Sequence, residues 1–144
     1  MGRGKKTALI VFGVVIALAA IAGVYYFLPT APKTIEGVWV SEDGMVVFDY
    51  KAGLARSYMA AQYAANTLPF QTFSYIVTDN MMRVFGGKEA NGEDVSLPPY
   101  TAEMRFSFGN RVVTMFDSDV RMNSFYRWGS PEARLLLLTN NWYK

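Results

Sequence analysis

The sequence predicts a mainly β domain, an antiparallel meander or a small barrel, preceded by one N-terminal transmembrane helix and followed by a short C-terminal helix. An uncharged apolar run lies near the N-terminus, segments of alternating apolar and polar residues follow it, and a leucine run led by a proline lies near the end. The chain also holds ten Phe, nine Tyr and three Trp in 144 residues. Aromatic residues at this frequency, in alternating segments, favour strands.

The predicted membrane anchor spans residues 8–28, in which no side chain is charged. As a helix, a run of this length crosses a hydrocarbon core of about 30 Å. Basic residues cluster before the run, and Lys and Arg favour the cytoplasmic flank of a span. Residues 1–7 are therefore predicted in the cytoplasm, and the rest beyond the plasma (inner) membrane, in the periplasm or at the cell exterior. The basic residues are Arg3, Lys5 and Lys6 before the run and Lys33 after it.

A cleaved signal peptide is the alternative interpretation of the same run. Ala20-Ile21-Ala22 offers small residues at the spacing of a cleavage site. Cleavage there would leave an apolar new N-terminus, so we favour a retained signal-anchor, and either outcome exports the domain. Pro29 and Pro32 end the helix because proline lacks the amide donor. Residues 29–34 are then a short, stiff linker to a β domain at residues 35–144.

The charge of the predicted domain differs from that of the anchor. From Thr34 onward there are ten of the 14 Lys and Arg residues and all twelve acidic ones, which gives a formal charge of −2, against +2 for the whole chain. Nucleic-acid-binding domains carry basic surfaces that neutralise phosphates. We therefore expect no nucleic-acid partner.

The chain contains no Cys and no His. This composition excludes disulfides, zinc sites of the Cys or His type, haem with a His ligand, and Ser-His or Cys-His nucleophile pairs. A catalytic site would have to rest on carboxylates, but the local acidic pairs lie at predicted turns, where acids are usually solvated. We expect a non-enzymatic protein without a metal or cofactor. These acidic segments are Glu42-Asp43, Glu93-Asp94 and Asp117-Ser118-Asp119.

The clearest strand is residues 100–108, in which apolar and polar side chains alternate. Gly109-Asn110 follows it, and then a second apolar segment at residues 111–116. Gly and Asn tolerate positive φ, so the pattern is typical of a hairpin closed by a two-residue turn. In that register two apolar pairs share one face: Phe106 with Val113, and Met104 with Met115.

A second copy of this hairpin lies earlier in the chain, with Thr78-Asp79 in the turn. Two hairpins with equivalent inner faces predict a repeated meander, and closure into a barrel would remove its exposed edges. The sequence leaves closure open. The residues that align without a gap are Phe73, Tyr75, Val77, Met82 and Val84 with Met104, Phe106, Phe108, Val113 and Met115.

The remaining segments are shorter. The Ala-rich stretch Leu54–Asn66 is either a helix or an irregular strand. Ser130-Pro131-Glu132 has the residue types of a helix start, so we expect a helix over 133–138 whose leucines cap the core. Further strands are predicted at Gly37–Val40, Met45–Tyr50 and Arg121–Trp128.

Three short motifs occur together between Ile35 and Trp128. They are Gly37-Val38-Trp39 in the first strand, Val46-Val47-Phe48 leading to Lys51-Ala52-Gly53, and Tyr126-Arg127 in the last strand. With the two hairpins, they resemble the small bacterial lipocalin-like β-barrel domains. The resemblance implies that the tryptophan closes one end of a barrel beneath an arginine, so that Trp39 and Arg127 form a cation–π pair. The Leu54–Pro69 stretch departs from the pattern and leaves the strand count open.

Two functions are consistent with these features. The first is an anchored extracytoplasmic domain that binds a protein partner or serves as an accessory subunit of an envelope complex. The second is a lipocalin-like binder of a small apolar ligand or lipid, unless the rings simply fill the core. Exposed rings, near Tyr100 or in Trp142-Tyr143, would favour a protein contact, and rings around a void would favour a ligand. The candidate ligand-binding residues are Trp39, Phe48, Tyr75, Phe106 and Tyr126.

Overall fold

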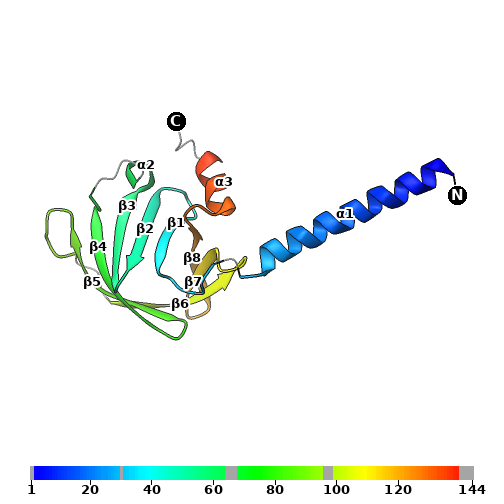
Figure 1. Ribbon diagram of the computed structural model, residues 1–144. Helices are drawn as coiled ribbons and strands as arrows, with labels where there is room; N and C mark the ends of the chain where they lie inside the picture. Colours follow the sequence, from blue (N-terminus) through cyan, green and yellow to red (C-terminus); the bar gives the residue numbers. More distant parts are fainter. Residues whose placement is uncertain (1, 30, 64–67, 96–98, 140–144) are drawn as a thin grey trace.

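The computed structural model describes residues 2–29, 31–63, 68–95 and 99–139. Eight strands form one closed antiparallel barrel in which neighbours in sequence pair and β8 closes the ring on β1 (Figure 1). The predicted mainly β fold is confirmed, and closure pairs both edges of the meander. The strands are β1 (Gly37–Ser41), β2 (Val46–Lys51), β3 (Leu54–Met59), β4 (Gln71–Thr78), β5 (Met81–Glu89), β6 (Tyr100–Ser107), β7 (Val112–Asp117) and β8 (Val120–Arg127).

The N-terminal helix α1 (Arg3–Phe27) projects away from the barrel (Figure 1). The part Arg3–Tyr25 is long and apolar enough to cross a membrane. Its side chains lie outside the protein core, since Leu9 and Ile10 are each 66 % exposed. An apolar helix that finds no cover within its own chain needs another apolar environment.

The ambiguous Ala-rich stretch contains both kinds of structure. Residues 54–59 form β3, α2 (Ala60–Tyr63) follows as a single turn, and residues 64–67 of the stretch lie outside the described residues. Residues 54–59 form a strand in which buried and more exposed side chains alternate: Ala55 and Ser57 are buried in the barrel, while Leu54 is exposed.

The predicted cap of the C-terminal helix α3 (Pro131–Thr139) is confirmed. The Ala133 amide donates to Ser130 Oγ at 3.1 Å, as expected of a serine N-cap. Its leucines do not cap the barrel core, however. α3 lies on the outer wall, where Leu137 is buried and Leu135 and Leu138 are exposed.

The buried side chains form two clusters because part of the barrel wall is covered on both faces. The inner cluster fills the barrel, and the outer cluster lies between the wall and the helices α2 and α3. Neighbouring strand residues therefore alternate between clusters, with Trp39 inside and Val38 and Val40 outside. The buried members of the outer cluster are Val40, Val47, Ala60, Ala133 and Leu137.

The β6–β7 hairpin has the predicted register, with Phe106 opposite Val113 and Met104 opposite Met115. Gly109 and Asn110 adopt φ of 63° and 66° at the centre of its turn. Both conformations are left-handed, which explains the Gly-Asn pair at this position.

The predicted turn of the β4–β5 hairpin was one residue too early. Thr78 pairs with Met81, so the turn is centred on Asp79-Asn80, and Asp79 has a φ of 54°. Asp tolerates this left-handed conformation better than the β-branched Thr78. The partner of Tyr75 is consequently Val84, two residues beyond the residue implied by the repeat, and the same face stays inward.

Candidate functional site

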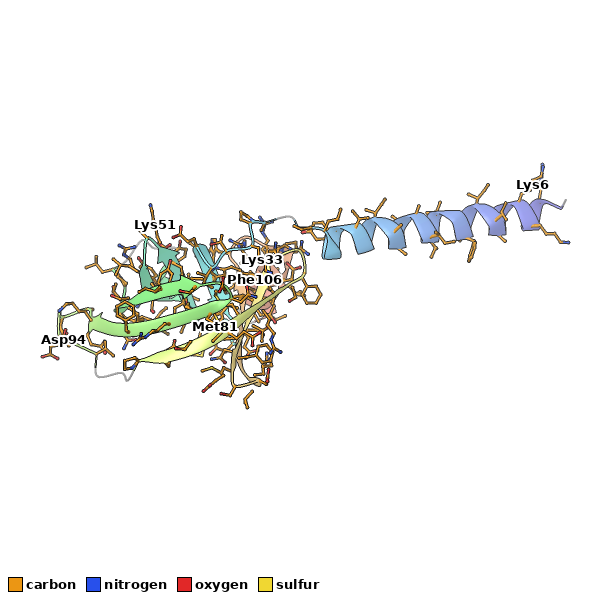
Figure 2. The ribbon with its side chains drawn as sticks, turned by 90° about the horizontal axis from the view of Figure 1, so that it is seen from below. Lys6, Lys33, Lys51, Met81, Asp94 and Phe106 are labelled. Carbon is orange, nitrogen blue, oxygen red and sulfur yellow. The ribbon has the colours of Figure 1, made fainter. Side chains whose placement is uncertain are left out.

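The two ends of the barrel have different architectures. We call the end reached by residues 31–36 the linker end; it also carries the β2–β3, β4–β5 and β6–β7 turns. The opposite end, with the other four connections between strands, is the far end. Figure 2 shows Lys33 and Phe106 on the side of α1, and Asp94 at the opposite side of the barrel.

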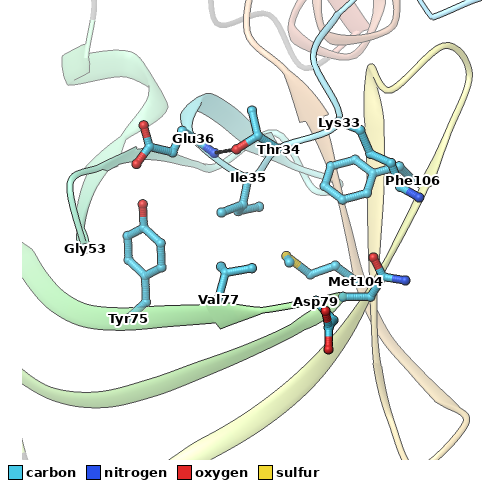
Figure 3. A pocket seen from close by; sticks show the side chains of 11 residues that line it. Lys33, Thr34, Ile35, Glu36, Gly53, Tyr75, Val77, Asp79, Met104 and Phe106 are labelled. Atoms are coloured by element: carbon cyan, nitrogen blue, oxygen red, sulfur yellow. Dashed lines mark hydrogen bonds between the residues drawn. The ribbon is translucent and has the colours of Figure 1, made fainter.

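A recess with a volume of about 460 Å³ opens at the linker end (Figure 3). This volume lies within the range of about 300–1,000 Å³ that is typical of small-molecule sites. One wall is apolar and the rim is polar, so the recess is amphipathic. The apolar wall comprises Ile35, Val77, Met104 and Phe106, the rim comprises Lys33, Thr34, Glu36, Asp79 and Asn80, and Tyr75 and Gly53 complete the lining.

Tyr75 supplies a buried hydroxyl to this recess. The residue is 5 % exposed, and its hydroxyl points toward Glu36 and Gly53 (Figure 3). Burial raises the pKa of Tyr75, the charge of Glu36 raises it further, and the Gly53 amide opposes the shift. The hydroxyl is therefore protonated at neutral pH. Among the described residues it has no hydrogen-bond partner, and the Gly53 amide, as a donor, cannot accept its proton.

A pair of tyrosine rings divides the interior of the barrel. Tyr50 meets Tyr75 edge to face, with ring centroids 5.2 Å apart. On the far side of Tyr50, two recesses of about 80 and 60 Å³ share Phe48, Tyr50 and Tyr100. Burial raises the pKa of Tyr50 well above its usual range, with smaller contributions from Tyr100 and Tyr75. The far-end recesses are too small for a ligand of ordinary size.

The cation–π contact implied by the resemblance is present in the structure. The Arg127 Cζ atom lies 4.3 Å from the ring centroid of Trp39, which is fully buried. The indole Nε1 of Trp39 donates to the carbonyl of Ile35 at 2.7 Å. Arg127 Nη2 donates to the carbonyls of Pro32 and Thr34 at 3.1 and 3.2 Å. Burial lowers the pKa of Arg127. This pair therefore fastens the linker to the barrel.

Arg111 connects the barrel to the end of α1. It is 4 % exposed; its Nη1 donates to the carbonyl of Tyr25 at 3.0 Å, and its Cζ lies 4.5 Å from the Tyr25 ring centroid. Its Nη2 lies 3.1 Å from the carboxylate of Glu132 at the start of α3. Beside it, Asn110 Nδ2 donates to the carbonyl of Ala31 at 3.1 Å. The linker end of the barrel is thus held next to the end of the apolar helix.

The five candidate ligand-binding residues are not brought together. Tyr75 and Phe106 line the large recess, whereas Phe48 lines the far-end recesses. Trp39 is packed between the recess residue Phe106 and Arg127. Tyr126 lies outside the barrel in the outer cluster, because it pairs with the outward-facing Val40.

Sequence reasoning missed the rim of the recess and Arg111. The rim combines the linker with turns that lie far apart in the sequence, and no local pattern marks such a combination. Arg111 directly follows a turn, where a basic residue is normally solvated. For Asp79 a weak signal existed, since Asp-Asn is a common turn pair.

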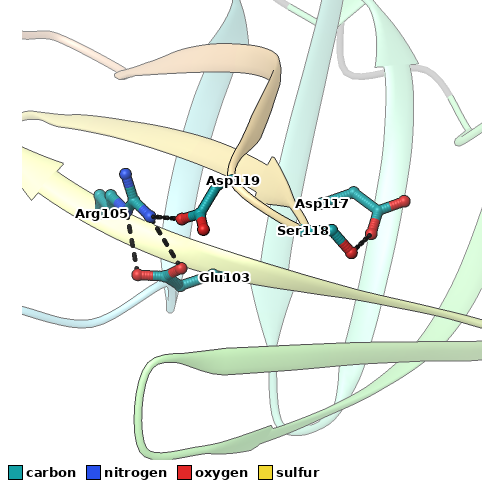
Figure 4. Close-up of polar contacts among 5 residues, drawn as sticks. All are labelled: Glu103, Arg105, Asp117, Ser118 and Asp119. Carbon is teal, nitrogen blue, oxygen red and sulfur yellow. Dashed lines mark hydrogen bonds and ion pairs between the residues drawn. The ribbon is translucent and has the colours of Figure 1, made fainter.

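The acidic segments take part in ordinary surface contacts. Arg105 bridges Glu103 and Asp119, with closest distances of 2.9 and 2.7 Å (Figure 4). The hydrogen bond from Arg105 is the main cause of the lowered pKa of Glu103. The other contacts are Glu42 with Arg121, Asp94 with Lys88, Asp117 with Ser118, and Asp43 with Ser41. Within the described ranges, no three acidic residues converge as a metal site would require.

Comparison of the chain with protein-family models, with curated proteins and with solved structures found no match. A closed eight-stranded antiparallel barrel is compatible with a lipocalin-like barrel. Membership of that family stays a prediction.

Proposed function

We propose that this protein is a membrane-anchored barrel that binds a small apolar or amphipathic lipid in its linker-end recess. The recess itself is the observation that carries the proposal, because it combines sufficient volume with an apolar wall. Most aromatic rings of the barrel strands point inward. At the linker end Tyr75 and Phe106 line the recess, whereas at the far end the rings pack against one another.

The position of the recess supports a lipid as the ligand. α1 is apolar enough to span a membrane, and Arg111 holds the β6–β7 turn against the Tyr25 carbonyl near its end. With α1 inserted, the linker end faces the bilayer surface. A lipid could then move into the recess over a short path through the headgroup region. In this arrangement residues 1–7 lie in the cytoplasm and the barrel lies outside it.

A photoreactive residue within the recess tests this proposal. Benzoylphenylalanine is placed at Val77, which lines the recess, or at Ile76, which is 54 % exposed on the outer face of the same strand. The full-length proteins are irradiated in their native membranes, and their intact masses are measured. We expect an adduct of lipid-like mass at position 77 and not at position 76. Equal lipid adducts at both positions, or none at position 77, would contradict the proposal.

A protein partner is the second candidate function, in which the domain serves as an accessory subunit of an envelope complex. The outer face of α3 favours it, since Leu135 and Leu138 are 65 % and 62 % exposed. Tyr100, which the sequence indicates as a candidate for such a contact, is half-exposed. The other candidates, Trp142-Tyr143, lie outside the described residues. The photoreactive residue at Leu135 would then give an adduct of protein size.

A further inference from the structure

The polar corner of the linker-end recess constrains the headgroup of its ligand. We infer that the recess selects an uncharged amphiphile, whose polar group is an alcohol or an ester oxygen, over a fatty-acid carboxylate. This inference rests on the proposed function and adds the ligand class to it.

The hydroxyl of Tyr75 favours a ligand that carries an acceptor atom. Its oxygen is buried near the Gly53 amide, its proton has no acceptor in the described part of the chain, and the hydroxyl points toward the rim residue Glu36 (Figure 3). A buried polar group without a partner is destabilising, so a ligand that supplies a partner gains that free energy on binding. A protonated phenol has one proton to donate. The ligand must therefore present an acceptor atom at this corner.

The charged group nearest to that acceptor position is negative. Glu36 lies beside the Tyr75 hydroxyl, and its carboxylate already accepts the Ala52 amide at 3.3 Å. Asp79 adds a second negative charge to the rim, while Lys33 lies across the recess beside Phe106 (Figure 3). A carboxylate on the Tyr75 hydroxyl would be repelled by Glu36 in a partly desolvated site. An alcohol oxygen accepts from Tyr75 and also has a proton to donate to Glu36.

The apolar wall of the recess suits the hydrocarbon chain of an amphiphile. Ile35, Val77 and Met104 line the recess between Tyr75 and Phe106 (Figure 3). An acyl or alkyl chain packed there loses contact with water, which favours binding in proportion to the apolar area buried. An ammonium group would satisfy Glu36 but would leave the Tyr75 proton without an acceptor.

Matched photoreactive probes test the inference on the full chain in phosphatidylcholine nanodiscs. Three medium-chain probes carry the same diazirine and alkyne and differ only in their head: alcohol, carboxylic acid or amine. Labelling of the recess peptides is divided by labelling of α1, which reports how much of each probe is in the bilayer. We expect the alcohol to label the recess several-fold more than the acid or the amine.

Two substitutions assign the preference to the named groups. Tyr75→Phe keeps the ring, and we expect it to lower labelling by the alcohol about three- to tenfold, the effect of one lost hydrogen bond, with little change for the acid. Glu36→Gln should raise labelling by the acid several-fold. Tyr100→Phe, at the far end, is the matched control and should change neither ratio.

The outcomes separate the inference from the proposed function. Labelling by the acid or the amine that equals or exceeds labelling by the alcohol overturns the inference, and so does a Tyr75→Phe variant that labels like the wild type. The Val77→Trp variant is designed to fill the recess. If none of the three probes labels the wild-type recess more strongly than the recess of this variant, the proposed function itself is overturned.

Discussion

The two ends of the barrel are made from the same kind of hairpin but differ in how the interior is filled. At the far end the rings of Phe48, Tyr50 and Tyr100 leave recesses of only about 80 and 60 Å³. At the linker end a recess of about 460 Å³ remains, and two arginines bind carbonyls of the entering chain. In this barrel, polar contacts to the linker replace apolar filling at the end that retains a cavity.

The largest predicted loss of stability comes from removing Trp39, which holds the linker against the barrel through Arg127. Trp39→Ala removes a fully buried ring together with its contact with Arg127. We expect a loss of about 3–5 kcal/mol in the free energy of unfolding, as for other buried aromatic side chains. Denaturant unfolding of the full chain in detergent measures it. Trp128→Ala, on the half-buried outer wall, is the control, and an equal loss in both variants would contradict this role.

The second prediction concerns the connection to α1. Arg111→Leu leaves Glu132, at 16 % side-chain exposure, without its partner, and frees the Tyr25 carbonyl. We expect a loss of about 2–3 kcal/mol, below the figure for a fully buried pair. Distances between spin labels on α1 and the barrel should also become broader. Arg105→Leu breaks two exposed ion pairs and the cation–π contact with Phe116, and it should cost about 1 kcal/mol with unchanged distances. Similar losses of stability and similar broadening of the distances in both variants would contradict a role of Arg111 in holding α1 to the barrel.

The third prediction compares two glycines with left-handed φ. At Gly109 an added Cβ would lie 2.3 Å from the Leu28 carbonyl oxygen, whereas at Gly92 nothing lies within 4 Å. Both alanine variants should lose about 1 kcal/mol through backbone strain. Gly109→Ala should lose roughly a further 1–2 kcal/mol through the overlap with the end of α1. Equal losses in the unfolding free energy would mean that the linker contact contributes nothing.

The smallest predicted effect is the pH dependence of stability caused by Tyr50, whose ring separates the two ends of the barrel interior. The raised pKa of Tyr50 means that the unfolded chain loses the proton first as the pH rises. Its stabilising contribution is complete below pH of about 10 and falls above that value by up to about 1.4 kcal/mol per pH unit. Unfolding measured at rising alkaline pH should therefore show a weaker decline in Tyr50→Phe than in the wild type. Tyr126→Phe, on the outer wall, is the control, and a decline unchanged by Tyr50→Phe would place the titration elsewhere.

Local patterns of the sequence were sufficient for much of the fold. Alternation located the β6–β7 hairpin, and Gly109-Asn110 set its register because few other residues adopt two successive left-handed conformations. Ser130 and Pro131 located the start of α3, since capping depends on neighbouring residues only. The apolar run predicted α1 as a candidate membrane span through length and composition alone.

The tertiary structure decided what depends on contacts between distant segments. Alternation shows which residues share a face, but it does not show which face turns inward when α3 covers the outer wall; Tyr126 was therefore placed wrongly within the candidate site. Closure depends on the pairing of β1 with β8 at opposite ends of the domain. The recess, in turn, exists only where the linker and the hairpin turns meet, so its lining residues carry no common local signal in the sequence.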